Sequence, residues 1–126
     1  MRPDNASERT GGQTSFAQRR SEEHQRVISR QWRGLARTEQ ASSYEQHLRN
    51  ETFPSLGSIE GFVDATILKR TLPNGIEFLV VTRWSSMAAI EKFAGADVEA
   101  AVVPDKVQAM MLEYDRRVKH YEVVTE

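Results

Sequence analysis

The chain has 126 residues and a formal net charge of −1 at pH 7, with 17 Lys and Arg against 18 Asp and Glu. This length gives room for one domain, and the near-neutral balance does not indicate nucleic acid or a membrane surface as a partner. The lack of cysteine excludes disulfides and thiolate catalysis, and three scattered histidines give no metal-binding pattern. Because no apolar run suggests a membrane span or a signal peptide, we expect a cytoplasmic protein.

The first 25 residues have the composition of a tail. Phe16 is the only large apolar residue after Met1, among many Ser, Thr, Gln and charged residues. Such a segment cannot bury enough apolar surface to offset the entropy lost on ordering. We therefore predict a disordered tail over residues 1–25 and one folded domain over residues 26–126.

The domain is predicted to begin with a strand and a helix. Residues 27–36, VISRQWRGLA, alternate well enough for a strand. Thr38 is the expected N-cap of the helix that follows, with Glu39 in its first turn. We expect this helix to end at Phe53, because the residue before a proline, here Pro54, is disfavoured in the α region.

A hairpin is predicted next. Residues 61–70 form its first strand, and the LPNG turn at 72–75 suits a hairpin because proline presets φ and Asn-Gly tolerates positive φ. The following strand, 75–84, carries the continuous apolar run FLVV at 78–81. A strand that is apolar on both faces must be covered on both faces.

The C-terminal part is predicted to contain two helices and a last strand. The first helix ends at Gly95, and one more helical turn fits within residues 97–103. Asp105 then caps a second helix, and residues 117–124 form the final strand. The inward residues of the two helices are Met87, Ile90 and Phe93 in the first and Val107, Met110, Met111 and Tyr114 in the second.

The resulting order, β-α-β-β-α-β, is the ferredoxin-like plan: an α+β fold with a four-stranded antiparallel sheet covered by helices on one face. The other face would stay apolar, and soluble monomers rarely expose so large a patch. We therefore predict a homodimer in which two sheets pack face to face. Alternation leaves two candidate interface sets, Phe78 with Val80 and Leu79 with Val81.

Short stretches across residues 28–124 carry a family resemblance. They are SRQWRG at 29–34, IEGF at 59–62, TRWSS at 82–86, FAG at 93–95, AVVP at 101–104 and HYEV at 120–123. On these residues the domain resembles the antibiotic biosynthesis monooxygenase-like proteins of the dimeric α+β-barrel superfamily. The resemblance implies a dimeric α+β barrel. It also implies one of several activities, among them cofactor-free oxygenation of polycyclic phenols, heme degradation and isomerisation.

Three sequence positions bear on whether this chain resembles the heme-degrading branch of the family. Members of that branch have an asparagine, a tryptophan and an iron-ligating histidine at these positions. By resemblance, the matching residues of this chain are Gln31, Phe93 and Val103. Only the amide is roughly kept here. The resemblance therefore implies no heme, and we expect a protein without a cofactor.

Cofactor-free oxygenation needs a base in a dry, aromatic-lined pocket. His47 follows Tyr44 by three residues and shares a helix side with Leu48, which points it towards the sheet. A partly desolvated, neutral imidazole there is our candidate catalytic base, with Arg30 or Gln31 supporting the substrate anion. The further candidate substrate-binding residues are Tyr44, Phe93, Met111 and His120.

Each candidate also has a structural interpretation. Tyr44 and His47 could be half-buried fillers, Met111 a flexible gap-filler, and His120 a neutral partner across the dimer seam. Arg30, Arg33 and Arg83 are expected to pair with carboxylates, the candidates being Asp64, Glu77 and Glu122.

Two functions therefore remain open. The first is a cofactor-independent monooxygenase-like enzyme acting on a hydrophobic aromatic or phenolic small molecule. The second is a non-catalytic dimer that binds a hydrophobic metabolite or is purely structural. A cavity on the order of 300 Å³ or more would favour the enzyme, and a filled interior would favour the alternative.

Overall fold

The computed structural model describes residues 27–125, and Ile28–Tyr121 form one compact unit. The predicted tail, residues 1–25, lies outside the described residues, so the domain boundary remains a prediction. Of the described residues beyond the compact unit, Val123 donates a backbone hydrogen bond to the carbonyl of Val27 at 2.9 Å. In the described part of the chain, no helix has the length and apolar character needed to cross a membrane.

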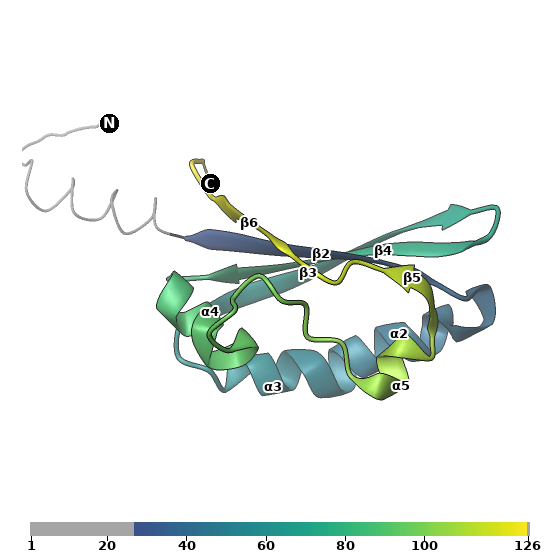
Figure 1. Ribbon diagram of the computed structural model, residues 1–126, viewed down its shortest axis with the longest axis horizontal. Helices are drawn as coiled ribbons and strands as arrows, with labels where there is room; N and C mark the ends of the chain where they lie inside the picture. Colours follow the sequence, from purple (N-terminus) through teal and green to yellow (C-terminus); the bar gives the residue numbers. More distant parts are fainter. Residues whose placement is uncertain (1–26, 126) are drawn as a thin grey trace, which may run out of the picture. The chain divides into compact units, whose positions relative to one another are not determined.

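The core of the unit is an antiparallel sheet of the predicted ferredoxin-like class (Figure 1). Strand β2 (Ile28–Ala36) pairs along its length with β4 (Gly75–Trp84), which pairs in turn with β3 (Phe62–Leu72). Strands β3 and β4 are joined by the two residues Pro73 and Asn74, which confirms the predicted hairpin.

The other edge of β2 differs from the prediction. Helix α5 (Asp105–Gln108) has only four residues, and the segment expected to continue it is strand β5 (Met111–Tyr114). That strand pairs antiparallel with the end of β2, and β6 (Lys119–Glu122) also pairs with β2. The predicted four-stranded sheet therefore has five strands. Backbone hydrogen bonding to the open edge of β2 outweighs the helical spacing of apolar residues in this segment.

The first helical segment also differs in detail. It comprises a 3-10 turn η1 (Thr38–Gln40), α2 (Ala41–His47), a π-helical turn η2 (Leu48–Thr52) and α3 (Phe53–Gly57). The helix thus continues past Pro54. In a regular α-helix, proline clashes with the carbonyl four residues earlier, and the wider π turn before α3 displaces those carbonyls. Arg37, not Thr38, occupies the N-cap position, with no capping side chain.

Helix α4 (Met87–Ala94) follows the prediction. Ser86 is its N-cap and accepts a hydrogen bond from the backbone N–H of Ala89 at 3.1 Å. Gly95 ends the helix with φ of 89°, a conformation that suits glycine. Residues 97–103, in contrast, form a bend, a turn, an isolated β-bridge at Ala100 and irregular chain, not the expected helical turn.

The helices of the described residues all lie on one side of the sheet (Figure 1). Along β4, Phe78, Val80, Thr82 and Trp84 are buried, whereas the residues between them are partly exposed. The helices therefore cover the face with Phe78 and Val80. The alternative set left by the sequence, Leu79 with Val81, lies on the open face.

Candidate functional site

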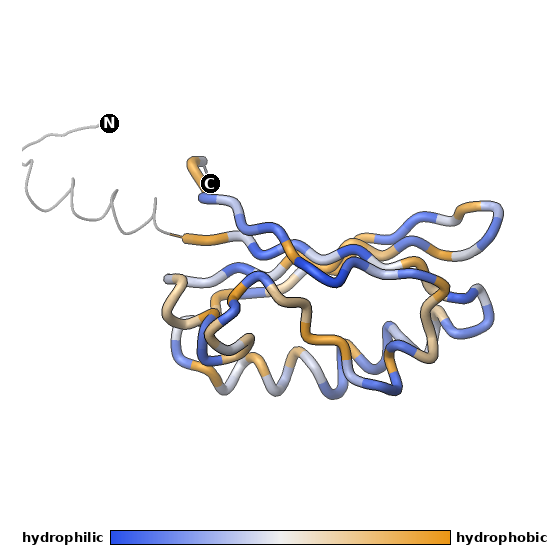
Figure 2. The backbone as a smooth tube through the Cα atoms, in the orientation of Figure 1, coloured by the Kyte–Doolittle hydropathy of each residue, from blue (hydrophilic) through white to orange (hydrophobic). Residues whose placement is uncertain are grey.

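A pocket lies between the sheet and the elements that cover it. Its walls come from β2, β4, α2, η2, α3, α4 and α5, together with the segment between α4 and α5 and with Val118, which lies just before β6. The second half of that segment is apolar (Figure 2) and contributes Val102, Val103 and Pro104 to the wall. The cavity volume is about 80 Å³. This volume is well below the roughly 300 Å³ expected of a site for a polycyclic ligand.

His47 projects from α2 into the pocket wall and is 9% exposed. Its ring stacks beside Tyr44, with centroids 6.5 Å apart and an interplanar angle of 20°. Its Nδ1 atom is buried and has no hydrogen-bond partner among the described residues. The carboxylate oxygen Oε1 of Glu51 lies 3.5 Å from His47 Nδ1. The two groups form an ion pair only when the imidazole is protonated.

Glu51 is a site neighbour that the sequence reasoning missed. It follows His47 by four residues in the helix, and both of its carboxylate oxygens accept hydrogen bonds from Lys106 at 2.9 and 3.0 Å. The Lys106 hydrogen bond, more than any other contact, lowers the pKa of the Glu51 carboxyl. The helical spacing of four could have indicated the first contact. Lys106 is 55 residues away, so no local pattern could have indicated the second.

Tyr44 forms an aromatic wall. Its ring meets Phe78 edge-on with centroids 5.0 Å apart and lies 6.1 Å from Trp32. Burial raises the pKa of the Tyr44 phenol above its ordinary value, so the hydroxyl stays neutral at physiological pH. Tyr44 can therefore contact a ligand but cannot serve as an anionic base.

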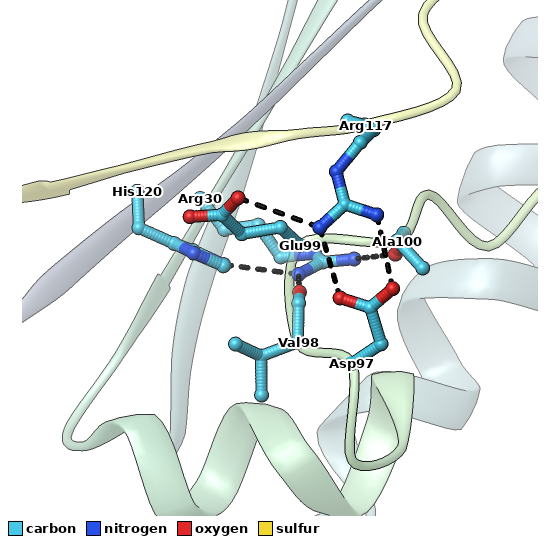
Figure 3. Close-up of polar contacts among 7 residues, drawn as sticks. All are labelled: Arg30, Asp97, Val98, Glu99, Ala100, Arg117 and His120. Carbon is cyan, nitrogen blue, oxygen red and sulfur yellow. Dashed lines mark hydrogen bonds and ion pairs between the residues drawn. The ribbon is translucent and has the colours of Figure 1, made fainter.

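Arg30 brings a buried cation to the same pocket, with 5% of the residue exposed. Its Nη1 donates to the carbonyl of Val98 at 2.5 Å and lies 3.0 Å from His120 Nε2, while Nη2 donates to the carbonyl of Ala100 at 2.9 Å (Figure 3). Phe93 lies beside the guanidinium, with its centroid 5.6 Å from Cζ. Burial lowers the pKa of Arg30 to about 10, which still leaves it charged at neutral pH.

His120 contacts the guanidinium of Arg30 but does not line the pocket. Because Arg30 Nη1 can only donate, His120 Nε2 is the acceptor and the imidazole is neutral in this contact. Burial, followed by the charge of Arg30, lowers the pKa of His120, while Glu99 opposes the shift. The role predicted for His120 across a dimer seam stays a prediction. What the structure shows is a hydrogen bond within the chain.

Of the other three predicted site residues, one lines the pocket and two do not. Phe93 lines the pocket. Met111 is buried in the core cluster and is not part of the pocket wall. Gln31 donates to Ser29 Oγ at 3.2 Å and pairs with Val81, so it lies on the open face, away from the pocket. Of the two proposed anion supports, only Arg30 reaches the site.

The pocket also contains two of the positions that bear on heme. Phe93 and Val103, where the resemblance would require tryptophan and histidine, both line it. Within residues 27–125, no group of three or more His, Cys, Asp and Glu side chains is arranged to hold a metal ion.

These features define an α+β protein with a small, mostly apolar pocket between its sheet and helices. A family model described as antibiotic biosynthesis monooxygenase matches residues 35–105. The chain belongs to the antibiotic biosynthesis monooxygenase family, which confirms the resemblance found in the sequence. No curated protein matches the chain.

Solved structures share the fold at low sequence identity. A putative antibiotic biosynthesis monooxygenase from Bacillus cereus is 17% identical, with a TM-score of 0.51 over 79% of this chain and 95% of its own. A variant of SnoaB, a cofactor-independent oxygenase from Streptomyces nogalater, is 11% identical, with a TM-score of 0.57 over 80% and 96%. The heme-degrader MhuD from Mycobacterium tuberculosis, with two hemes bound, is 17% identical, with a TM-score of 0.52 over 79% and 97%. At these identities the likeness establishes the fold alone.

Proposed function

We propose that this chain is a cofactor-independent monooxygenase-type enzyme that acts on a small hydrophobic aromatic or phenolic molecule, with His47 as its general base. One observation carries the proposal: His47, a buried imidazole whose Nδ1 has no hydrogen-bond partner among the described residues, lines the wall of a mostly apolar pocket. A neutral imidazole can accept a proton from a ligand hydroxyl. Membership of the family supports the same reaction class.

In the proposed reaction, His47 and Arg30 have separate roles. His47 takes the phenolic proton, and the positive charge of Arg30 stabilises the resulting anion. The electron-rich anion then reduces O2 by one electron, and recombination forms a carbon–oxygen bond. Loss of water from the resulting hydroperoxide leaves a carbonyl group, so no outside reductant is required. The apolar walls exclude bulk water from these steps.

The cavity size favours a second function. At about 80 Å³ the space is much smaller than a polycyclic phenol needs. This observation supports the alternative of a non-catalytic protein that binds a small hydrophobic metabolite or serves as a structural dimer. It also narrows the enzymatic proposal to substrates of about one ring.

The open sheet face supports a homodimer. Leu79 and Val81 on this face are only partly covered, and Leu68, which pairs with Leu79, is 50% exposed. We propose that a second copy packs on this face, as predicted from the sequence, because it would cover these partly exposed apolar side chains. They lie beside charged and polar residues of the same face, among them Gln31 and Arg33.

Oxygen uptake tests the enzymatic proposal. The protein is incubated with hydroquinones and anthrones of one to three rings under O2, and we expect turnover of the smallest. His47→Ala should lower turnover by about 10²-fold or more, the usual contribution of a general base. His24→Ala is the matched control and should leave turnover unchanged. Full activity in the His47 variant would remove His47 from the mechanism, and ligand binding without uptake would favour the non-catalytic alternative.

A further inference from the structure

Arg30 is the only permanently charged residue in the pocket wall formed by the described residues. No Asp or Glu within residues 27–125 forms an ion pair with it, although Arg33 pairs with Glu77 and Arg83 with Asp64, as expected. Consistent with this, burial is the only cause of its lowered pKa, and no nearby carboxylate opposes the shift. A buried cation without a counter-ion is unfavourable, and an anionic ligand would relieve that cost.

The hydrogen bonds of Arg30 leave part of its guanidinium unused. The group carries five N–H donors. Nη1 uses two, towards Val98 and His120, and Nη2 uses one, towards Ala100. Nε–H and one Nη2–H remain without a partner in the part of the chain that the structure describes.

These two nitrogens are the pair that this protein uses elsewhere for a carboxylate. Arg83 holds Asp64 through Nε to Oδ1 at 2.9 Å and Nη2 to Oδ2 at 2.6 Å. Two neighbouring N–H groups match the two oxygens of a carboxylate better than the single oxygen of a phenolate. The free donors of Arg30 therefore favour a carboxylate ligand.

The remaining wall indicates what that carboxylate is attached to. Phe93 lies beside the guanidinium, and the Tyr44 and Trp32 rings lie elsewhere in the same lining. Aromatic walls favour a flat apolar ligand, and the small cavity limits it to about one ring.

We propose that the pocket binds a small aromatic carboxylate, with the carboxylate on Nε and Nη2 of Arg30 and a single ring against the apolar walls. This inference rests on the proposed function for the location of the site, and it deepens that function by adding a carboxylate to the single-ring phenolic substrate.

Calorimetric titration of the full chain with benzoate, benzamide and acetate tests the proposal. Benzamide keeps the shape of benzoate but lacks its charge, and acetate keeps the carboxylate but lacks the ring. We expect benzoate to bind at least about 10-fold more tightly than either compound. Equal affinity of benzamide would overturn the carboxylate contact, and equal affinity of acetate would overturn the ring site.

Substitutions then assign the contact to Arg30. Arg30→Met should weaken benzoate binding by about 10-fold or more, and Arg30→Lys, which keeps the charge but loses the paired donors, should recover only part of it. Arg37→Met is the matched control, because this exposed arginine follows the same strand directly and is not part of the pocket wall, and it should bind as the wild type does. Unchanged benzoate affinity in folded Arg30→Met would overturn the assignment. If that variant does not fold, the wild-type ligand series decides.

The titration requires no turnover. Benzoate selectivity without any oxygen uptake would therefore contradict the proposed oxygenation alone. Oxygen uptake with neutral phenols, together with equal binding of benzoate and benzamide, would contradict the carboxylate site alone.

Discussion

At the scale of single residues, Arg30 and His120 form a pair in which one buried cation fixes the state of a neighbouring base. His120 can accept the Arg30 hydrogen bond only while Nε2 is unprotonated. Arg30 in turn holds the carbonyls of Val98 and Ala100, in the turn that precedes the pocket-lining residues Val102 to Pro104. The protonation state of His120 is therefore linked to how this segment is held beside the pocket.

The pair predicts a pH dependence of stability. In the folded protein the pKa of His120 is lowered below its ordinary 6.5, so the unfolded chain binds the proton first as pH falls. The contribution of neutral His120 to the free energy of unfolding is fully present above about pH 6.5. It is lost as pH decreases below that value towards the folded-state pKa. His120 is partly exposed, so we expect a change of only a few degrees in melting temperature. His120→Gln should flatten this part of the curve in thermal melts between pH 5 and 8, whereas His24→Gln should not. The same pH slope in the His120 variant would contradict the prediction.

The sequence predicted some of the pocket-lining residues but not others, for local reasons. The three-residue spacing of Tyr44 and His47 correctly placed both on the inner side of the helix, where they line one pocket. Arg30 and Gln31 are adjacent in a strand, so only one could face that pocket, and the alternation did not say which. The expected carboxylate partner of Arg30 is replaced by two backbone carbonyls, which leave no trace in a residue pattern.

At the scale of elements, segments with strong local signals were predicted well. The hairpin at the LPNG turn and the helix that ends at Gly95 both formed as expected. Neither Asn74 nor Gly75, however, adopts the positive φ that the Asn-Gly pair tolerates. Met111–Tyr114 had a helical spacing of apolar residues but became strand β5, because the unpaired edge of β2 needed hydrogen bonds. The sequence could not show that the edge was available.

Two glycines provide a matched test of backbone conformation. Nothing lies within 4 Å of a Cβ built at Gly95 or Gly57, so neither substitution is limited by space. Gly95 has φ of 89° and ψ of −172°, a region that is almost restricted to glycine, and Gly95→Ala should destabilise the protein by about 1–3 kcal/mol. Gly57 is in α3, outside the left-handed region, and Gly57→Ala should stabilise it by about 0.5 kcal/mol. Urea unfolding measures both changes, and equal effects at the two sites would contradict this explanation.

At the scale of the whole molecule, one sheet has two different faces. The helices cover one, and the other carries Arg33–Glu77 and Arg83–Asp64 ion pairs together with Leu68, Leu79 and Val81. Ion pairs at the margin of an apolar patch are typical of protein interfaces, whose apolar centre is surrounded by a polar rim. This arrangement favours a second copy of the chain on the open face.

The N-terminal segment gives a simpler prediction. Its composition indicates that it adds little to the core, so deletion of residues 1–24 should leave the melting temperature and the mass of the assembly unchanged. Differential scanning calorimetry and light scattering of the shortened chain measure the two quantities. A loss of several degrees, or a change in assembly, would show that this segment packs against the folded unit.

The dimer is tested by two neighbouring substitutions on β4. Leu79 lies on the open face, so Leu79→Asp should leave the monomer folded but place an unpaired charge in the proposed interface, at a cost of several kcal/mol to association. Phe78 is fully buried beneath the helices, so Phe78→Asp should instead prevent folding. Sedimentation velocity at micromolar concentration should show a wild-type dimer and a Leu79→Asp monomer, with circular dichroism confirming that the monomer is folded. A dimeric Leu79→Asp variant would place the interface elsewhere, and a monomeric wild type would show that the open face is stable in water without a partner.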